Sequence, residues 1–109
     1  MVKNNFISEL TEKEFEDFHK KGLVVIDFFA EWCMPCTMMS PIMEELSEKF
    51  KGKLKIGKVN ISENESIAEK FGVSSIPTFI IFKDGKIVKQ FSGMTSSEEF
   101  SDILNRFLR

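Results

Sequence analysis

The segment from Leu23 to Phe29 constrains the fold of this chain more than any other feature. It is apolar except for Asp27 and rich in β-branched side chains, which is typical of a β-strand. Successive side chains of a strand point to opposite faces of its sheet, so a strand of this kind must be covered on both faces. Because helices provide such cover in α/β proteins, the segment predicts the central strand of an α/β domain.

The flanking sequence predicts further helices and strands in alternation. Residues 11–14 and 96–99 have the spacing of a capping box and precede apolar residues at helical spacing. The first of these helices is expected to end before Gly22. Asp84 and Gly85 predict a tight hairpin, which requires a mixed sheet. The other predicted helices lie at residues 35–50 and 67–72, and the other predicted strands at residues 53–60, 78–82 and 87–91.

The two cysteines of the chain, Cys33 and Cys36, follow directly after the central strand. Three positions apart, they can close a small disulfide and reopen it, and no further cysteine is present to staple loops together. Structural zinc normally needs four ligands, and the only histidine, His19, belongs to the first predicted helix, where we expect it to be solvated. The pattern therefore predicts redox chemistry and no metal site.

A cysteine attacks a disulfide only as its thiolate, so one of the two sulfurs needs an environment that favours negative charge. A helix that begins near Met34 or Pro35 would direct its free N–H groups and the positive end of its dipole at Cys33. Proline suits this first turn because it has no N–H group. Cys36, one turn further in, is expected to be more shielded and to resolve the mixed disulfide.

Asp27 is the exceptional residue of the central strand. Burial should raise the pKa of its carboxyl, which could then take a proton from Cys36 and return it in the reverse reaction. Lys58, on the neighbouring predicted strand, is a candidate partner that would oppose the rise in pKa. Alternatively, the Asp27 carboxylate could interact with a neighbouring group and take no part in catalysis.

These residues, in their order and spacing, resemble the thioredoxin family over nearly the whole chain. The strand around Asp27 is similar to the family's buried-Asp strand, and Trp32 stands before the cysteine motif as in the family. Ile76 and Pro77 match its cis-proline segment, and Gly93 matches the glycine beside its substrate groove. The resemblance implies the fold order βαβαβαββα, with a central mixed sheet flanked by helices on both faces, in one domain spanning residues 1–109.

The resemblance also implies an activity, the reduction of disulfides in partner proteins by thiol–disulfide exchange. Cys33 would be the nucleophile, Cys36 the resolving thiol and Asp27 the proton acceptor and donor. The substrate-binding residues would be Trp32, Ile76, Pro77 and Gly93. The sequence contains no G-x-G-x-x-G nucleotide fingerprint, so we expect no bound cofactor and a separate thioredoxin reductase as the source of electrons.

Three positions depart from the family pattern. Met34 stands where the family usually has Gly, Thr37 where Lys is common, and Phe29 where Trp is frequent. The residues between the cysteines most affect the relative stability of dithiol and disulfide, so Met34 and Pro35 are expected to tune the redox potential, together with Lys58 beside Asp27.

Two other functions are compatible with this motif. A protein of the same fold could donate its disulfide as an oxidant or isomerase, although such proteins often carry a His between the cysteines. A non-catalytic module could instead use the groove around Trp32, Ile76 and Gly93 to hold a partner chain.

Charge and hydropathy narrow the set of partners. The net charge of −2 is nearly balanced, which argues against a nucleic-acid surface, and no apolar stretch approaches the length of a membrane span. The first residues lack the apolar core of a secretory signal, so we expect a cytoplasmic monomer that acts on disulfide-containing proteins.

Overall fold

The computed structural model of the protein describes residues 7–108. The elements follow in the order β1 (Ile7–Glu9), α1 (Glu12–Phe18), β2 (Leu23–Phe29), α2 (Met34–Lys49), β3 (Lys55–Asn60), α3 (Glu65–Lys70), β4 (Thr78–Lys83), β5 (Lys86–Ser92) and α4 (Ser97–Phe107). This order, βαβαβαββα, is the one that the family resemblance implied, and it is confirmed.

The five strands form one mixed sheet in the order β1-β3-β2-β4-β5. β2 lies at its centre, parallel to β3 and antiparallel to β4, and every residue of β2 is buried. The prediction of a central strand with two covered faces is therefore confirmed. In this register Asp27 of β2 lies opposite Lys58 of β3.

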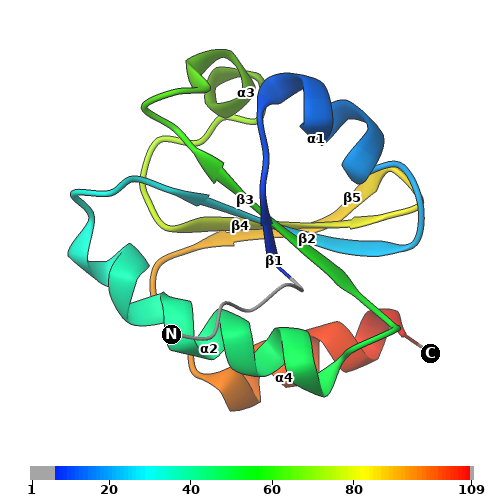
Figure 1. Ribbon diagram of the computed structural model, residues 1–109. Helices are drawn as coiled ribbons and strands as arrows, with labels where there is room; N and C mark the ends of the chain where they lie inside the picture. Colours follow the sequence, from blue (N-terminus) through cyan, green and yellow to red (C-terminus); the bar gives the residue numbers. More distant parts are fainter. Residues whose placement is uncertain (1–6, 109) are drawn as a thin grey trace.

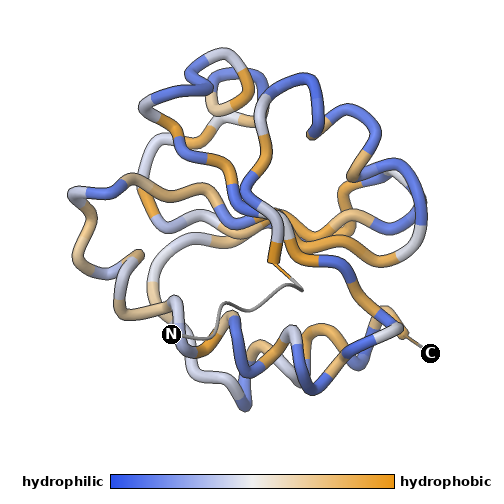
Figure 2. Tube along the Cα trace, in the orientation of Figure 1, coloured by the Kyte–Doolittle hydropathy of each residue, from blue (hydrophilic) through white to orange (hydrophobic). Residues whose placement is uncertain are grey.

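Helices cover both faces of the sheet (Figure 1). Residues of α1 and α3 share one apolar cluster with one face of β2, and residues of α2 and α4 share another cluster with the opposite face. Phe15 and Phe28 belong to the first cluster, and Met39, Phe79 and Phe100 belong to the second. The hydropathy of the chain follows this layering, with apolar strands in the middle and hydrophilic stretches along the helices (Figure 2).

Local hydrogen bonds explain where the helices begin. The Thr11 hydroxyl accepts from the Glu14 N–H, and the Glu14 carboxylate accepts from the Thr11 N–H, which completes the predicted capping box of α1. At α4 the Ser96 hydroxyl accepts from the Glu99 N–H at 3.1 Å. Both N-termini therefore lie where the capping pattern predicted them.

Some predicted boundaries were wrong by about one turn or less. α1 ends at Phe18 rather than just before Gly22, α3 covers Glu65–Lys70 rather than 67–72, and β3 begins at Lys55 rather than at residue 53. The apolar pattern identifies which residues of a helix or strand face the core. It does not show at which polar residue the helix or strand begins or ends.

The expectation for His19 was also wrong. Its imidazole stacks on Phe15 with 4.5 Å between ring centroids and meets the edge of Phe82 at 4.9 Å, and its Nδ1 lies 2.9 Å from the Phe15 carbonyl oxygen. The side chain is half-buried because the chain turns back toward β2 at the end of α1.

Candidate active site

The two cysteines lie at the junction of β2 and α2 and form a disulfide, with 5.3 Å between their Cα atoms. β2 ends at Phe29, and a short turn leads into α2, so the strand delivers the motif directly to the N-terminus of the helix. The disulfide packs in a small apolar cluster of its own. The other members of this cluster are Phe29, Ala30, Ile61 and Ile76.

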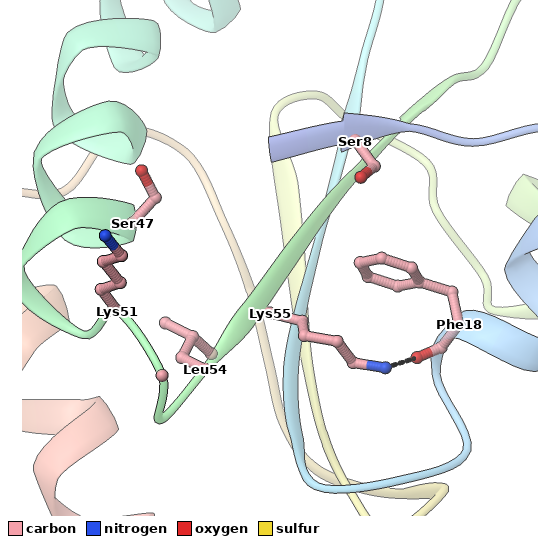
Figure 3. A pocket seen from close by; sticks show the side chains of 7 residues that line it. Ser8, Phe18, Ser47, Lys51, Leu54 and Lys55 are labelled. Atoms are coloured by element: carbon pink, nitrogen blue, oxygen red, sulfur yellow. Dashed lines mark hydrogen bonds between the residues drawn. The ribbon is translucent and has the colours of Figure 1, made fainter. Parts of the chain in front are cut away.

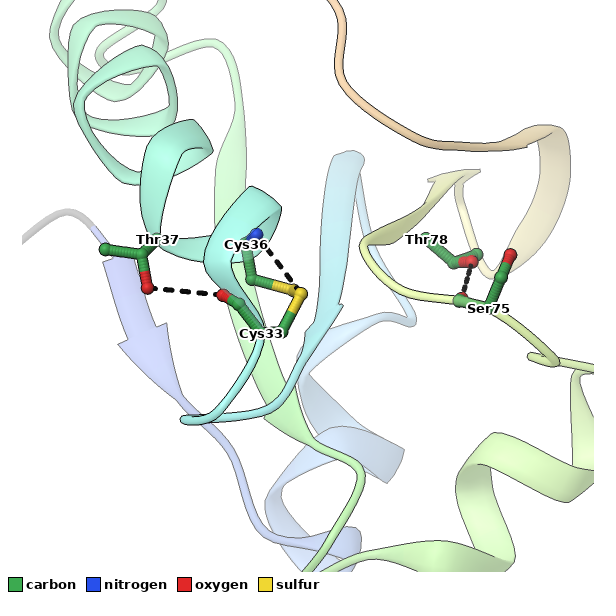
Figure 4. The surroundings of a disulfide bond; sticks show 5 residues. All are labelled: Cys33, Cys36, Thr37, Ser75 and Thr78. Carbon is green, nitrogen blue, oxygen red and sulfur yellow. Dashed lines mark hydrogen bonds between the residues drawn. A yellow bond between two sulfur atoms is a disulfide. The ribbon is translucent and has the colours of Figure 1, made fainter.

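Cys33 is the N-cap residue of α2. Its Sγ accepts a hydrogen bond from the Cys36 N–H at 3.2 Å, and its carbonyl oxygen accepts from the Thr37 hydroxyl at 3.3 Å (Figure 4). Pro35 occupies the first turn, as predicted. A backbone donor and the positive end of a sixteen-residue helix thus act on the Cys33 sulfur and favour negative charge on it when the disulfide is open.

The expectation that Cys36 is more shielded than Cys33 was wrong. The exposed fractions of the two residues are 6% and 5%, respectively. The closed disulfide holds both sulfurs against the same apolar cluster, so position along the helix does not separate them.

Asp27 lies on β2, two residues before Phe29 and therefore on the same face of the sheet. Burial raises the pKa of its carboxyl to about 7, and the positive charge of Lys58 acts in the opposite direction. Within residues 7–108 its Oδ1 has no hydrogen-bond partner. Both directions agree with the prediction from sequence, in which burial raises the pKa of this carboxyl and Lys58 opposes the rise.

A second segment approaches the disulfide from β4. The Ile76–Pro77 peptide bond is cis, and Ile76 packs against the apolar cluster that contains the cysteines. The Gly93 N–H donates to the Pro77 carbonyl oxygen at 2.9 Å, and Gly93 has a φ of +92°, which favours glycine. The structure therefore brings Ile76, Pro77 and Gly93 to one place beside Cys33 and Cys36.

Several large apolar side chains near the motif are exposed. Trp32 is 74% exposed and Met34 is 68% exposed, so neither serves as a core residue. Met38, one turn after Met34, and Met94, directly after Gly93, are also exposed. Met94 is not among the residues predicted from sequence, although its place directly after Gly93 is a signal that could have identified it.

Other features of the molecule lie away from this site. Among the residues that the structure describes, no three His, Cys, Asp or Glu side chains gather as they would around a metal ion, and no helix is long and apolar enough to cross a membrane.

A cavity of about 260 Å³ opens near the first residues of β3, where the Lys55 ammonium donates to the Phe18 carbonyl oxygen at 2.9 Å (Figure 3). Its lining contains no member of the cysteine cluster.

A helix that begins at a C-x-x-C disulfide, directly after the central strand of a mixed sheet, defines a redox protein whose cysteines exchange disulfides. Comparison with known proteins assigns the family. The thioredoxin family model matches residues 6–106.

Curated relatives cover almost the whole chain. Thioredoxin from Listeria monocytogenes is 40% identical over 102 residues, which is 94% of this chain and 99% of the relative. Thioredoxin from Chlamydia caviae is 44% identical over 100 residues, 92% of this chain and 97% of the relative. The solved structure of a mutant thioredoxin from Halobacterium salinarum superposes with a TM-score of 0.88 at 26% identity and covers 100% of this chain and 96% of that one.

The chain belongs to the thioredoxin family. It is a thiol–disulfide oxidoreductase of the protein-disulfide reductase type, and its cysteine pair fits the family's C-x-x-C active site.

Proposed function

We propose that Cys33 is the nucleophile and Cys36 the resolving thiol of this reductase. The observation that carries this assignment is the hydrogen bond from the Cys36 N–H to the Cys33 Sγ at the N-cap of α2. The Cys33 thiolate attacks one sulfur of the substrate disulfide and releases the other as a thiolate. Cys36 then attacks the Cys33 sulfur, which closes the Cys33–Cys36 disulfide and releases the second substrate thiolate, so that two electrons pass to the substrate.

Asp27 accepts the proton that Cys36 loses as it attacks and returns it in the reverse reaction. A buried carboxyl with a pKa of about 7 can both take and give a proton near neutral pH. Its Oδ1 has no hydrogen-bond partner in the described part of the chain and is available for this transfer. Lys58 tunes the carboxyl through its charge.

The substrate binds as an extended segment beside the disulfide. Ile76 offers its backbone for hydrogen bonds to this segment, Pro77 and Gly93 shape the groove, and the exposed Trp32 packs against the bound chain. Met34 and Pro35, between the cysteines, tune the redox potential, and the exposed thioether of Met34 adds an adaptable apolar contact.

The dithiol is regenerated by a separate thioredoxin reductase, and the protein needs no bound cofactor of its own. It works as a monomer in the cytoplasm, where a reducing environment maintains the dithiol. The substrates are disulfide-containing proteins, with no role for nucleic acid or a membrane.

The experiment that tests these roles offers the reduced protein a disulfide-linked peptide and identifies mixed disulfides by mass spectrometry. Cys36→Ser is expected to accumulate a stable mixed disulfide on Cys33, and the matched variant Cys33→Ser is expected to accumulate none. Trapping on Cys36 instead would reverse the two roles. In the same assay Asp27→Asn should slow the resolving step by about 10-fold or more, and turnover equal to wild type at all pH values would remove the proton-transfer role.

A further inference from the structure

The Lys58 side chain ends on an aromatic ring. Its ammonium nitrogen lies 4.4 Å from the centroid of the Phe29 ring, within the range of a cation–π interaction. Phe29 is 9% exposed and belongs to the apolar cluster of the disulfide, so its ring is held in place by packing. The ring is therefore a fixed surface for the ammonium.

Two acidic residues lie opposite Lys58 in the sheet. The sheet register places Lys58 opposite Asp27 of β2 on one side and opposite Glu9 of β1 on the other. Within residues 7–108, however, no ion pair joins Lys58 to either of them, and the Asp27 Oδ1 has no hydrogen-bond partner. The ammonium of Lys58, the residue opposite Asp27 in the sheet, thus contacts the Phe29 ring and forms no ion pair with the Asp27 carboxyl.

The strand geometry explains this arrangement. Asp27 and Phe29 are two residues apart on β2 and face the same side of the sheet, so the long Lys58 side chain can reach either of them. The cysteines at the start of α2 form a disulfide and so carry no charge in the oxidised protein.

We propose that Phe29 is a positioning residue for disulfide exchange: its ring holds the Lys58 ammonium and prevents Lys58 from forming an ion pair with Asp27. The carboxyl then stays neutral to a higher pH than it would with a contacting ammonium. The consequence for turnover rests on the proton-transfer role proposed above for Asp27, whereas the positioning itself does not.

The test follows the Asp27 carboxyl by carbon-13 NMR in the oxidised full-length protein, in which the cysteines do not titrate. Phe29→Leu keeps an apolar side chain but removes the aromatic face. Once the ammonium is free to contact the carboxyl, the Asp27 titration should move to lower pH by about one unit or more. Phe29→Trp keeps an aromatic face at this position, so its Asp27 carboxyl should titrate as in the wild type.

Two controls test whether Lys58 causes the shift in the Asp27 titration. In a Lys58→Met background, Phe29→Leu should no longer move the Asp27 titration, and an equal shift there would assign the effect to packing and overturn the proposal. Phe18→Leu removes a similar contact, since the Lys55 ammonium lies 4.7 Å from the Phe18 ring centroid on the other face of β3, and it should leave Asp27 unaffected.

A shape-preserving variant covers the case in which Phe29→Leu fails to fold. Pentafluorophenylalanine at position 29 keeps the size of the ring and reverses its electrostatic face, so it should move the Asp27 titration in the same direction as leucine. A titration equal to wild type in this variant would overturn the proposal. If the titration moves while the resolving step keeps its rate, the positioning role stands and the proton-transfer role of Asp27 fails.

Discussion

At the scale of single residues, Asp27 combines a structural cost with the proton-transfer role that we propose for it. It is a carboxyl in a strand that is otherwise apolar and wholly buried, and its Oδ1 has no hydrogen-bond partner within residues 7–108. Burial of an ionised carboxylate without a close partner is unfavourable, which is why the pKa rises to about 7. In the proposed mechanism, the same rise allows the carboxyl to exchange a proton near neutral pH.

This cost predicts a pH-dependent stability. The folded pKa of about 7 lies above the ordinary carboxyl value of 3.8, so the contribution of Asp27 is fully favourable below about pH 3.8 and is lost as the pH rises through 7. Compared with Asp27→Asn, the wild type should therefore lose free energy of unfolding between pH 4 and pH 8. The total loss should be about 4 kcal/mol at ~1.36 kcal/mol per pKa unit.

Urea denaturation of the oxidised proteins at a series of pH values measures this difference. The uncharged amide of the Asn variant adds an offset that does not change with pH, so the slope and not the absolute value is the test. The matched control is Asp102→Asn, which alters an exposed carboxyl on α4 and should give no comparable slope. A difference between Asp27→Asn and wild type that is flat with pH would contradict the prediction.

At the scale of elements, β3 shows how closely the layers approach one another. A Cβ atom on Gly57 would lie 2.5 Å from Leu10 Cδ1 and 3.0 Å from Phe18 Cε2. Leu10 is buried, and Phe18 is packed against the same core cluster. The absence of a side chain at this position lets the segment around α1 pack directly on the sheet.

Gly57→Ala is therefore expected to destabilise the fold by about 1–3 kcal/mol, because the added methyl group overpacks a closed layer. Chemical denaturation of the variant measures the loss. The double variant Gly57→Ala/Leu10→Ala should be more stable than the sum of the single effects implies, since truncation of Leu10 removes the nearest clash. Additive effects would show that the methyl group is accommodated elsewhere.

The elements also show which structural features the sequence could predict. Short-range signals were sufficient for the capping box at Thr11 and for the hairpin at Asp84 and Gly85, where φ is positive at both residues. β1, with three residues, has too little pattern of its own, and its place followed only from the family resemblance. The stacking of His19 on Phe15 depends on how α1 meets the sheet, which no local pattern contains.

The features of the candidate site also divide into those that the sequence could predict and those that only the structure could show. Cys33, Cys36 and Asp27 were identified from their spacing and their strand, and the raised pKa of Asp27 followed from burial alone. The equal burial of the two cysteines and the contact between Lys58 and the Phe29 ring depend on side-chain conformations. Sequence spacing does not determine these conformations, so only the structure could supply them.

At the scale of the whole molecule, we infer that the fold depends on the two helix-covered faces of the sheet and not on its disulfide. The buried aromatic and aliphatic side chains form one large cluster on each face, whereas the disulfide closes a loop between residues only three positions apart. In the chain-entropy view a loop this short stabilises the fold by only about 2 kcal/mol. The cysteines can therefore open and close during each turnover without loss of the fold.

We accordingly propose that residues 1–109 fold as a single cooperative domain in either redox state, and the variant Cys33→Ser/Cys36→Ser tests this. It should stay folded and unfold in one transition, with a free energy of unfolding about 2 kcal/mol below that of the oxidised wild type. Urea denaturation followed by Trp32 fluorescence and by far-UV circular dichroism measures both quantities. Coincident curves are expected because the Trp32 probe at the active site and the backbone probe would report one event. Separate midpoints would show that the region around the cysteines unfolds independently, and loss of the transition would show that the disulfide maintains the fold.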